Sequence, residues 1–273
     1  MILIPALTCA AAALTATALN ICRDISTASA KNAKDADMEI MKVKLIERIK
    51  RTNSVESFRF QPYHPIEFMP GQFAQILFDP RNKNNQNLNK YLSFCNSPAR
   101  DCIEVTKRLS DSLFSSRLRE LAIGDEVTIK APLGNCVFKD EYKKIIFLIG
   151  GIGITPVISI IEYIVDKKLD TQVNLFYSNR NEGDIAFKNE LDAWQTKHAN
   201  IKVTYTVTGC KPQDALCLFG EINQTMVQEM IADIPEQVFF IFGPPGMVLA
   251  MKHVCAKIGC DEDNLKTETF VGY

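Results

Sequence analysis

Two hydrophobic patterns divide the chain from Met41 onward. In the first, apolar and polar residues alternate over short stretches, which is the period of a strand with one buried face. These stretches are Val43/Leu45, Phe58/Phe60, Ala74/Ile76/Phe78 and Val127/Ile129. Turn-forming residues separate them, and Arg81–Asn89 is too rich in asparagine to be a strand. Several short strands of this kind predict an antiparallel β-barrel or sandwich.

The second pattern begins at Lys143, where Ile145–Ile149 is a continuous apolar run, as in a strand buried on both faces. Further strand-like runs follow at Val173–Tyr177, Lys202–Val207 and Val238–Phe242, with helical segments at Thr155–Lys168, Asp184–His198, Ile222–Ala232 and Met247–Ile258. This alternation predicts an α/β domain with a parallel sheet. We place the boundary near Asp140–Lys143, giving a β-barrel domain over residues 38–141 and an α/β domain over residues 142–273.

Composition argues against a small disulfide scaffold and against a nucleic-acid-binding protein. The chain has 273 residues, of which 47% are hydrophobic and 23% charged, so it can bury a core without disulfides. Its formal net charge of −1 gives no electrostatic sign of nucleic-acid binding, and we expect no nucleic-acid partner.

The cysteines and histidines suggest no metal site. The nine cysteines are scattered, which is typical of reduced intracellular thiols. Cys255 and Cys260 form a C-x4-C pair, but no second pair accompanies it, so we expect a structural role rather than an iron–sulfur cluster. The three histidines are far apart and match no zinc spacing.

Residues 1–37 are expected to lie outside the folded domains. Met1–Cys22 is uncharged and rich in Ala, Leu and Thr. Three interpretations stay open: a signal peptide cleaved after Ala28-Ser29-Ala30, a weakly hydrophobic membrane anchor, or a segment upstream of a true start at Met38 or Met41. A retained anchor would place the protein at a membrane, and otherwise we expect a cytoplasmic protein.

Two glycine loops carry the strongest chemical signal. Gly150-Gly151-Ile152-Gly153-Ile154-Thr155-Pro156 lies between a buried strand and a helix, where glycines admit a diphosphate close to the backbone and the helix N-terminus attracts it. Phe242-Gly243-Pro244-Pro245-Gly246-Met247 follows another apolar strand of the same sheet. Because ligands of open α/β sheets bind at the carboxyl edge, the two loops predict a crevice for an extended dinucleotide.

The order of motifs resembles the ferredoxin–NADP reductase-like flavoprotein superfamily, from about Met41 to Tyr273. The matching segments are Pro70-Gly71-Gln72-Phe73, Lys90-Tyr91-Leu92-Ser93, Ala131-Pro132-Leu133-Gly134-Asn135, the two glycine loops, and Glu268-Thr269-Phe270-Val271-Gly272-Tyr273. The resemblance implies an antiparallel barrel that holds FAD, or less commonly FMN, followed by an α/β domain that binds NADH or NADPH. It further implies hydride transfer from nicotinamide to flavin, with the protein orienting the two rings.

The resemblance also implies roles for individual residues at the flavin. Ser93 would offer its hydroxyl to flavin N5, Leu92 would cover one flavin face, and Lys90 would pair with the flavin phosphates in place of an arginine. Tyr273 would stack on the other flavin face until nicotinamide displaces it, and Glu268 would lie near the same ring. The full set of expected cofactor-binding residues is Lys90, Tyr91, Leu92, Ser93, Ser115, Pro132, Gly134, Gly150, Gly151, Gly153, Thr155, Pro156, Arg180, Gly243, Pro244, Pro245 and Met247.

Some positions depart from the superfamily pattern. Phe242 replaces a cysteine often found beside the nicotinamide, and Ala131 replaces a glycine. Arg180 could meet the 2′-phosphate of NADPH, but Thr208-Gly209 stands where NADP-specific relatives tend to have Ser-Arg, so we lean to NADH.

We expect an NAD(P)H-dependent flavoprotein reductase that passes electrons to a separate carrier, because no ferredoxin-like cysteine segment is fused to it. Ferredoxin, flavodoxin or an oxygenase component are the candidates. Two alternatives stay open: a reductase of free flavins, quinones or metal complexes, and a non-catalytic redox-sensing subunit of a larger complex.

Overall fold

The computed structural model describes residues 39–270, and the predictions for residues 1–37 and for Tyr273 lie outside these residues. The first half forms a six-stranded antiparallel sheet in the order β4-β3-β6-β1-β2-β5. Its strands are β1 (Glu39–Lys50), β2 (Val55–Pro62), β3 (Phe73–Leu77), β4 (Asn89–Ser93), β5 (Ile103–Arg108) and β6 (Glu126–Leu133). A bridge between Phe94 and Val105 joins its two edges, so the sheet closes into a barrel.

Alternation along the strands builds the barrel core. Val127, Ile129 and Ala131 of β6 point inward and pack with Phe58 and Phe60 of β2. Helix α2 (Leu113–Glu120) adds Phe114 and Leu118 to this core, and Ser112 caps its N-terminus by accepting from the Ser115 N–H.

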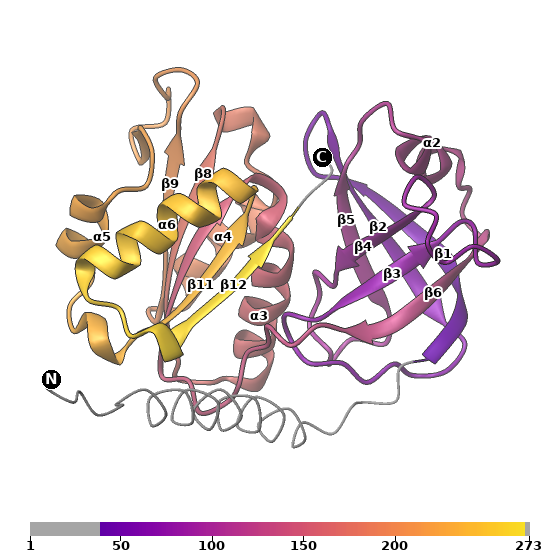
Figure 1. Cartoon of the computed structure of the whole chain (residues 1–273), viewed down its shortest axis with the longest axis horizontal. Coiled ribbons are helices and arrows are strands. Elements are labelled where there is room, and N and C mark those ends of the chain that lie inside the picture. Colours follow the sequence, from indigo (N-terminus) through magenta and orange to yellow (C-terminus); the bar gives the residue numbers. More distant parts are fainter. Residues whose placement is uncertain (1–38, 271–273) are drawn as a thin grey trace, which may run out of the picture. The chain divides into compact units, whose positions relative to one another are not determined.

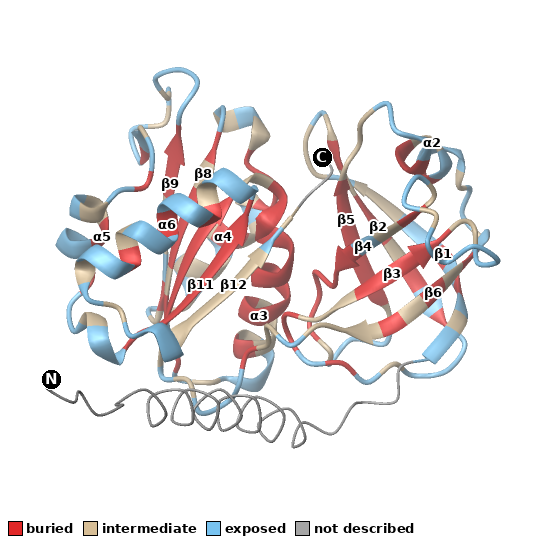
Figure 2. Ribbon diagram, viewed as in Figure 1, coloured by how far each residue is buried: buried red, intermediate tan, exposed pale blue. Residues whose placement is uncertain are grey.

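The second half forms a six-stranded sheet in which every neighbouring pair is parallel, in the order β10-β9-β8-β7-β11-β12 (Figure 1). Its strands are β7 (Lys144–Gly150), β8 (Gln172–Asn179), β9 (Ile201–Val207), β10 (Cys217–Phe219), β11 (Val238–Gly243) and β12 (Leu265–Thr269). The strands β7 and β11 are fully buried, which explains their continuous apolar runs (Figure 2).

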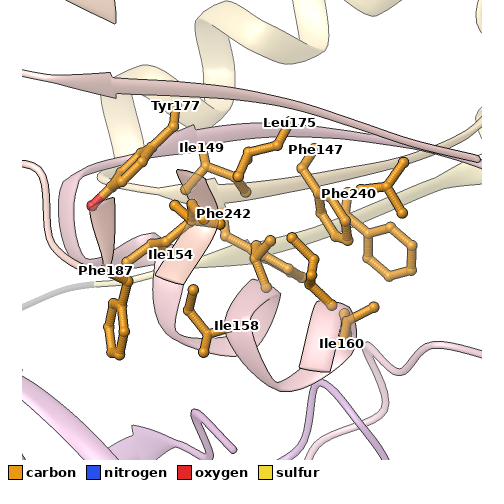
Figure 3. Packing of buried hydrophobic residues seen from close by; sticks show 14 of the residues in the cluster. Phe147, Ile149, Ile154, Ile158, Ile160, Leu175, Tyr177, Phe187, Phe240 and Phe242 are labelled. Carbon is orange, nitrogen blue, oxygen red and sulfur yellow. The ribbon is translucent and has the colours of Figure 1, made fainter. Parts of the chain in front are cut away.

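Helices cover both faces of this sheet. On one face α3 (Ile154–Lys167) and α4 (Lys188–Lys197) pack on alternate residues of the central strands, as Phe147, Ile149 and Phe240 show against Ile154 and Ile158 (Figure 3). On the other face α5 (Gln224–Met230) and α6 (Pro245–Ile258) pack on the intervening residues. Short 3₁₀ turns lie at Gly151–Gly153, Glu182–Asp184, Ile234–Glu236 and Glu262–Asn264.

Polar contacts join the barrel to α3 and α4. Arg51 at the end of the barrel strands bonds both Glu104, at 2.7 Å, and Glu190 of α4, and its guanidinium stacks on Phe187. The Ser97 N–H donates to Glu162 of α3 at 2.6 Å. The described residues 39–270 thus belong to one compact unit.

The predicted fold class is confirmed: an antiparallel β-barrel is followed by a parallel α/β sheet. Five elements were not located from the sequence, namely β4, β5, α2, β10 and β12, and the predicted polar loop Arg81–Asn89 ends one residue too late, because Asn89 begins β4. The predicted domain boundary falls between β6 and β7 and stays a prediction. Within residues 39–270 no helix is both long and apolar enough to cross a bilayer.

Candidate functional site at the carboxyl edge of the parallel sheet

The strand order creates a switch point at the sheet's carboxyl edge. Strand β7 lies in the middle; β8 pairs with it on one side and β11 on the other. The chain therefore leaves β7 in one direction and β11 in the opposite direction, which is the switch point where open α/β sheets bind ligands. The two predicted glycine loops follow these two strands.

The two loops touch each other at Gly150 and Gly153. A β-carbon at Gly150 would collide with the Met247 sulfur and lie 3.4 Å from Pro244 Cδ. A β-carbon at Gly153 would lie 2.7 Å from the Phe242 carbonyl carbon. Both contacts involve the opposite loop, but Gly153 meets backbone and has no room for a side chain, whereas a side chain at Gly150 would require Met247 to move.

The start of α3 offers backbone donors. Gly151 has a φ of +54°, which turns the chain from β7 into the helix. The Thr155 hydroxyl is buried and donates to the Ile152 carbonyl at 3.2 Å, so it stabilises the loop itself. Thr155 and Pro156 lie within the first helical turn, and a phosphate role for Thr155 stays a prediction.

A group of cations lies at the barrel side of this loop. The Arg108 Nη2, at the end of β5, is 3.8 Å from the position of a β-carbon on Gly151. Its neighbour Lys107 is buried, and burial, together with the charges of Lys90 and Arg108, lowers the Lys107 pKa to about 8. Lys90 was predicted from the sequence, whereas Lys107 and Arg108 were not, because they lie at the end of β5, a strand that the hydrophobic pattern did not predict.

Strand β4 separates its side chains between two faces. Leu92 lies opposite Ala74 of β3, packs in the barrel core and is only 7% exposed. Tyr91 and Ser93 lie on the other face; the Tyr91 ring is 61% exposed, and the buried Ser93 hydroxyl has no hydrogen-bond partner. The expectation that Leu92 covers a flavin face stays a prediction, and the exposed ring of this strand is that of Tyr91.

The remaining barrel residues of the expected site are engaged within the fold. The buried Ser115 hydroxyl accepts from the Ser110 N–H at 3.1 Å and from the Ser112 hydroxyl at 3.0 Å. Gly134 has a φ of +97°, and a β-carbon there would lie 2.6 Å from the Phe73 ring. Pro132 lies near the end of β6 and is half-buried. Ligand contacts of these residues stay predictions.

Glu268 is the unusual carboxylate at this edge. It lies on β12 opposite Phe242, and its Oε2 is buried without a hydrogen-bond partner. Burial raises the Glu268 pKa to about 7. Cys136, which follows β6, lies near enough that the charge of Glu268 adds to the burial that raises the Cys136 pKa to about 12. Tyr273, which is expected near Glu268, lies outside the described residues.

The ends of β8 and β9 form the part of the sheet's carboxyl edge that lies across β7 from β11. The Gly209 N–H donates to the Arg180 carbonyl at 2.8 Å, so the Thr208-Gly209 turn lies beside Arg180. The Arg180 side chain is exposed, and the side-chain amide of Asn179 is buried without a partner. The part of the chain that the structure describes holds no cluster of three or more His, Cys, Asp or Glu side chains suited to a metal ion.

Comparison with known proteins agrees with this geometry. Residues 147–253 match the family described as the oxidoreductase NAD-binding domain. An NADH-cytochrome b5 reductase 1 from Mortierella alpina is 28% identical over 233 residues, which are 83% of this chain and 77% of that protein. A nitrate reductase from Glycine max is 30% identical over 166 residues, but these cover only 19% of its length and 56% of this chain.

Solved structures share the two-part fold. The flavohem-like FAD/NAD-binding domain of a nitric oxide dioxygenase from Vibrio cholerae superposes with a TM-score of 0.74 at 17% identity, over 84% of this chain and 98% of that one. A ferredoxin–NADP⁺ reductase from Neisseria gonorrhoeae, with bound FAD and NADP, gives 0.71 at 17% identity, over 86% and 99% of the two chains. With its barrel, its parallel sheet and the two glycine loops at the switch point, the chain shares the fold of these two structures, and its residues 147–253 match the oxidoreductase NAD-binding domain family.

Proposed function

We propose that the protein takes hydride from NADH or NADPH onto an FAD held by the barrel and passes electrons to a separate carrier protein. The observation that carries this proposal is the approach of Arg108, at the end of a barrel strand, to Gly151 in the first nucleotide loop. This contact brings the barrel and the carboxyl edge of the sheet to one place, where a flavin and a nicotinamide can meet.

The barrel residues suit a flavin. A buried hydroxyl without a partner is costly, and a flavin nitrogen at hydrogen-bond distance from Ser93 would satisfy it. The exposed Tyr91 ring on the same face offers a stacking surface. Lys90, Lys107 and Arg108 supply positive charge for a diphosphate.

The sheet residues suit the nicotinamide nucleotide. Gly150 and Gly153 keep the two loops close, and the start of α3 presents N–H groups to phosphate oxygens. When bound, the flavin supplies the redox chemistry by accepting hydride and releasing electrons singly or in pairs. Glu268, half-buried and with a pKa of about 7, can hold or release a proton beside Phe242.

The choice of coenzyme depends on the ends of β8 and β9. The exposed Arg180 beside Thr208-Gly209 is the group there that could pair with a 2′-phosphate. We favour NADH as the coenzyme, because Thr208-Gly209 stands where NADP-specific relatives tend to have Ser-Arg. The name of the Mortierella alpina relative agrees with this preference. Arg180→Ala should then leave NADH turnover unchanged and lower any residual NADPH turnover.

We propose a class of electron acceptor from the chemistry of the flavin and do not name a single protein. A one-electron carrier, such as a small haem protein, ferredoxin, flavodoxin or oxygenase component, fits a flavin that divides a hydride into single electrons. The Mortierella alpina relative is named as a reductase of such a haem carrier, cytochrome b5. We propose a cytoplasmic location unless the N-terminal segment anchors the chain to a membrane. Reduction of free flavins or quinones is the alternative acceptor chemistry.

An anaerobic spectrum tests the proposal. We expect the purified full chain, after reconstitution with FAD, to show a flavin spectrum that bleaches on addition of NADH. Flavin that binds but resists both NADH and NADPH would favour a redox-sensing subunit. Failure to bind either FAD or FMN would overturn the proposal.

A further inference from the structure

Two cysteines lie side by side at the carboxyl end of helix α6. The second glycine loop lies at the opposite, amino end of this helix. Helix α6 (yellow in Figure 1) runs from Pro245 to Ile258 and ends at Gly259, whose φ of +81° is left-handed. The Gly259 N–H donates to the Ala256 and Cys255 carbonyls, and the Cys260 N–H donates to the Cys255 carbonyl at 3.0 Å. A backbone bond between residues five apart, across a left-handed glycine, is the Schellman motif.

This motif accounts for the pairing of the two side chains. It folds the residue after the glycine back onto the last turn of the helix, where an apolar contact between the two usually forms. In this chain Cys255 and Cys260 occupy those two positions. Both belong to the cluster beneath α6, in which Cys255 is 1% exposed and Cys260 is half-buried.

The two thiols interact directly. The Cys260 side chain is the hydrogen-bond partner that contributes most to the raised pKa of Cys255, and burial adds to it. The same hydrogen bond lowers the Cys260 pKa, against the opposing effects of burial and the Asp261 charge. Cys260 is therefore both the more exposed thiol and the one that more readily becomes the nucleophilic thiolate.

We propose that Cys255 and Cys260 form a peroxide-sensitive dithiol, a modification site that closes to an intramolecular disulfide at the carboxyl end of α6. The Cys260 thiolate attacks one peroxide oxygen, so that an S–O bond forms, the O–O bond breaks and hydroxide leaves. The Cys255 thiol then attacks the Cys260 sulfur, so that the S–S bond forms and water leaves. Hydrogen peroxide is reduced to two waters, and the two thiols are oxidised to one disulfide.

The site is separate from the electron-transfer site. Helix α6 has fourteen residues, so its last turn lies about 20 Å from its first at the usual rise per residue. The carboxyl end of a helix disfavours a thiolate, so we expect reaction with millimolar rather than trace peroxide.

Peroxide treatment of the full chain followed by alkylation tests the proposal. After hydrogen peroxide and then N-ethylmaleimide, peptide mapping should show Cys255 and Cys260 joined and protected from alkylation, and dithiothreitol should make both reactive again. Cys210→Ser is the matched control, because Cys210 is exposed and pairs with no other described cysteine, and this variant should form the same disulfide.

Two variants make the result decisive. In Cys255→Ser, Cys260 should stop at sulfenic acid, which a dimedone probe labels, or proceed to sulfinic acid. In Cys260→Ser, the buried Cys255 should stay reduced. Alkylation of both thiols after peroxide in the unmodified sequence, or Cys260 trapped by dimedone there with Cys255 free, would overturn the proposal.

Discussion

Gly153 lies against the backbone of Phe242, so that a β-carbon on Gly153 would be 2.7 Å from the Phe242 carbonyl carbon and 3.0 Å from the Gly243 nitrogen. This contact joins the loop after β7 to the loop after β11. Backbone cannot yield as a flexible side chain can, so any side chain at residue 153 must push the two loops apart.

The variant Gly153→Val should therefore weaken nucleotide binding at least tenfold while FAD stays bound to the barrel, because the displaced N–H groups would no longer face the diphosphate. Titration of the flavin spectrum with a non-reducing analogue, NAD⁺ or NADP⁺, measures the affinity. Gly183→Val is the control, since a β-carbon at Gly183 has no neighbour within 4 Å. Equal nucleotide affinities for the two variants would contradict the role of the loop.

The orientation of β4 makes a prediction that separates stability from flavin binding. Leu92→Ala should cost about 2–4 kcal/mol of unfolding free energy, because it leaves a cavity in the barrel core. Tyr91→Ala should cost less than about 1 kcal/mol but weaken FAD roughly twofold to tenfold, the equivalent of one lost stacking contact. Urea unfolding of the apoprotein and FAD titration measure the two quantities. The reverse pattern would identify Leu92 rather than Tyr91 as the flavin contact.

The sequence was sufficient for the sheets but not for the orientation of single residues. Continuous apolar runs located β7 and β11, since burial on both faces leaves a strong signal. Strand β12 was not predicted, because its sequence Leu-Lys-Thr-Glu-Thr is polar and lies at a sheet edge. Strand β10 was not predicted, because it has only three residues. The faces of β4 could not be predicted, because a motif gives the order of residues along a strand, whereas the pairing with β3 decides which face each residue occupies.

The positions of Lys107 and Arg108 likewise could not be predicted from the sequence. Lys107 and Arg108 look like ordinary charged residues in the sequence, and only the folded structure brings Arg108 beside Gly151 and Lys107 within reach of the Lys90 charge. Cys136 and Glu268 are more than a hundred residues apart, and their proximity depends on both sheets being in place.

Lys107 predicts a pH-dependent affinity for the dinucleotides. Burial and two neighbouring cations lower the Lys107 pKa to about 8, so the free protein loses this charge as pH rises through 8. A bound diphosphate favours the charged form, so affinity should fall as pH rises above about 8 and should be flatter in Lys107→Met. Titration of FAD into apoprotein between about pH 7 and 9.5 measures this. Lys197→Met, at an exposed lysine, should keep the slope of the unmodified protein.

Glu268 predicts a pH dependence of the unfolding free energy, in which the neutral form of the carboxyl group is the stabilising one. Its pKa is raised by burial to about 7, above the ordinary 4.5, so the folded protein binds more protons than the unfolded chain between these values. The stability contributed by the neutral carboxyl is complete below about pH 4.5 and is lost as pH rises through 7.

The variant Glu268→Gln stays neutral, so relative to the unmodified protein it should gain about 2 kcal/mol of unfolding free energy between pH 5 and pH 8. The rate of flavin reduction by NADH should lose any inflection near pH 7 in the same variant, because the titrating group is gone. Urea unfolding at both pH values and stopped-flow absorbance provide the two measurements. Glu229→Gln changes an exposed carboxylate and should alter neither. An inflection that survives in Glu268→Gln would assign the proton to another group.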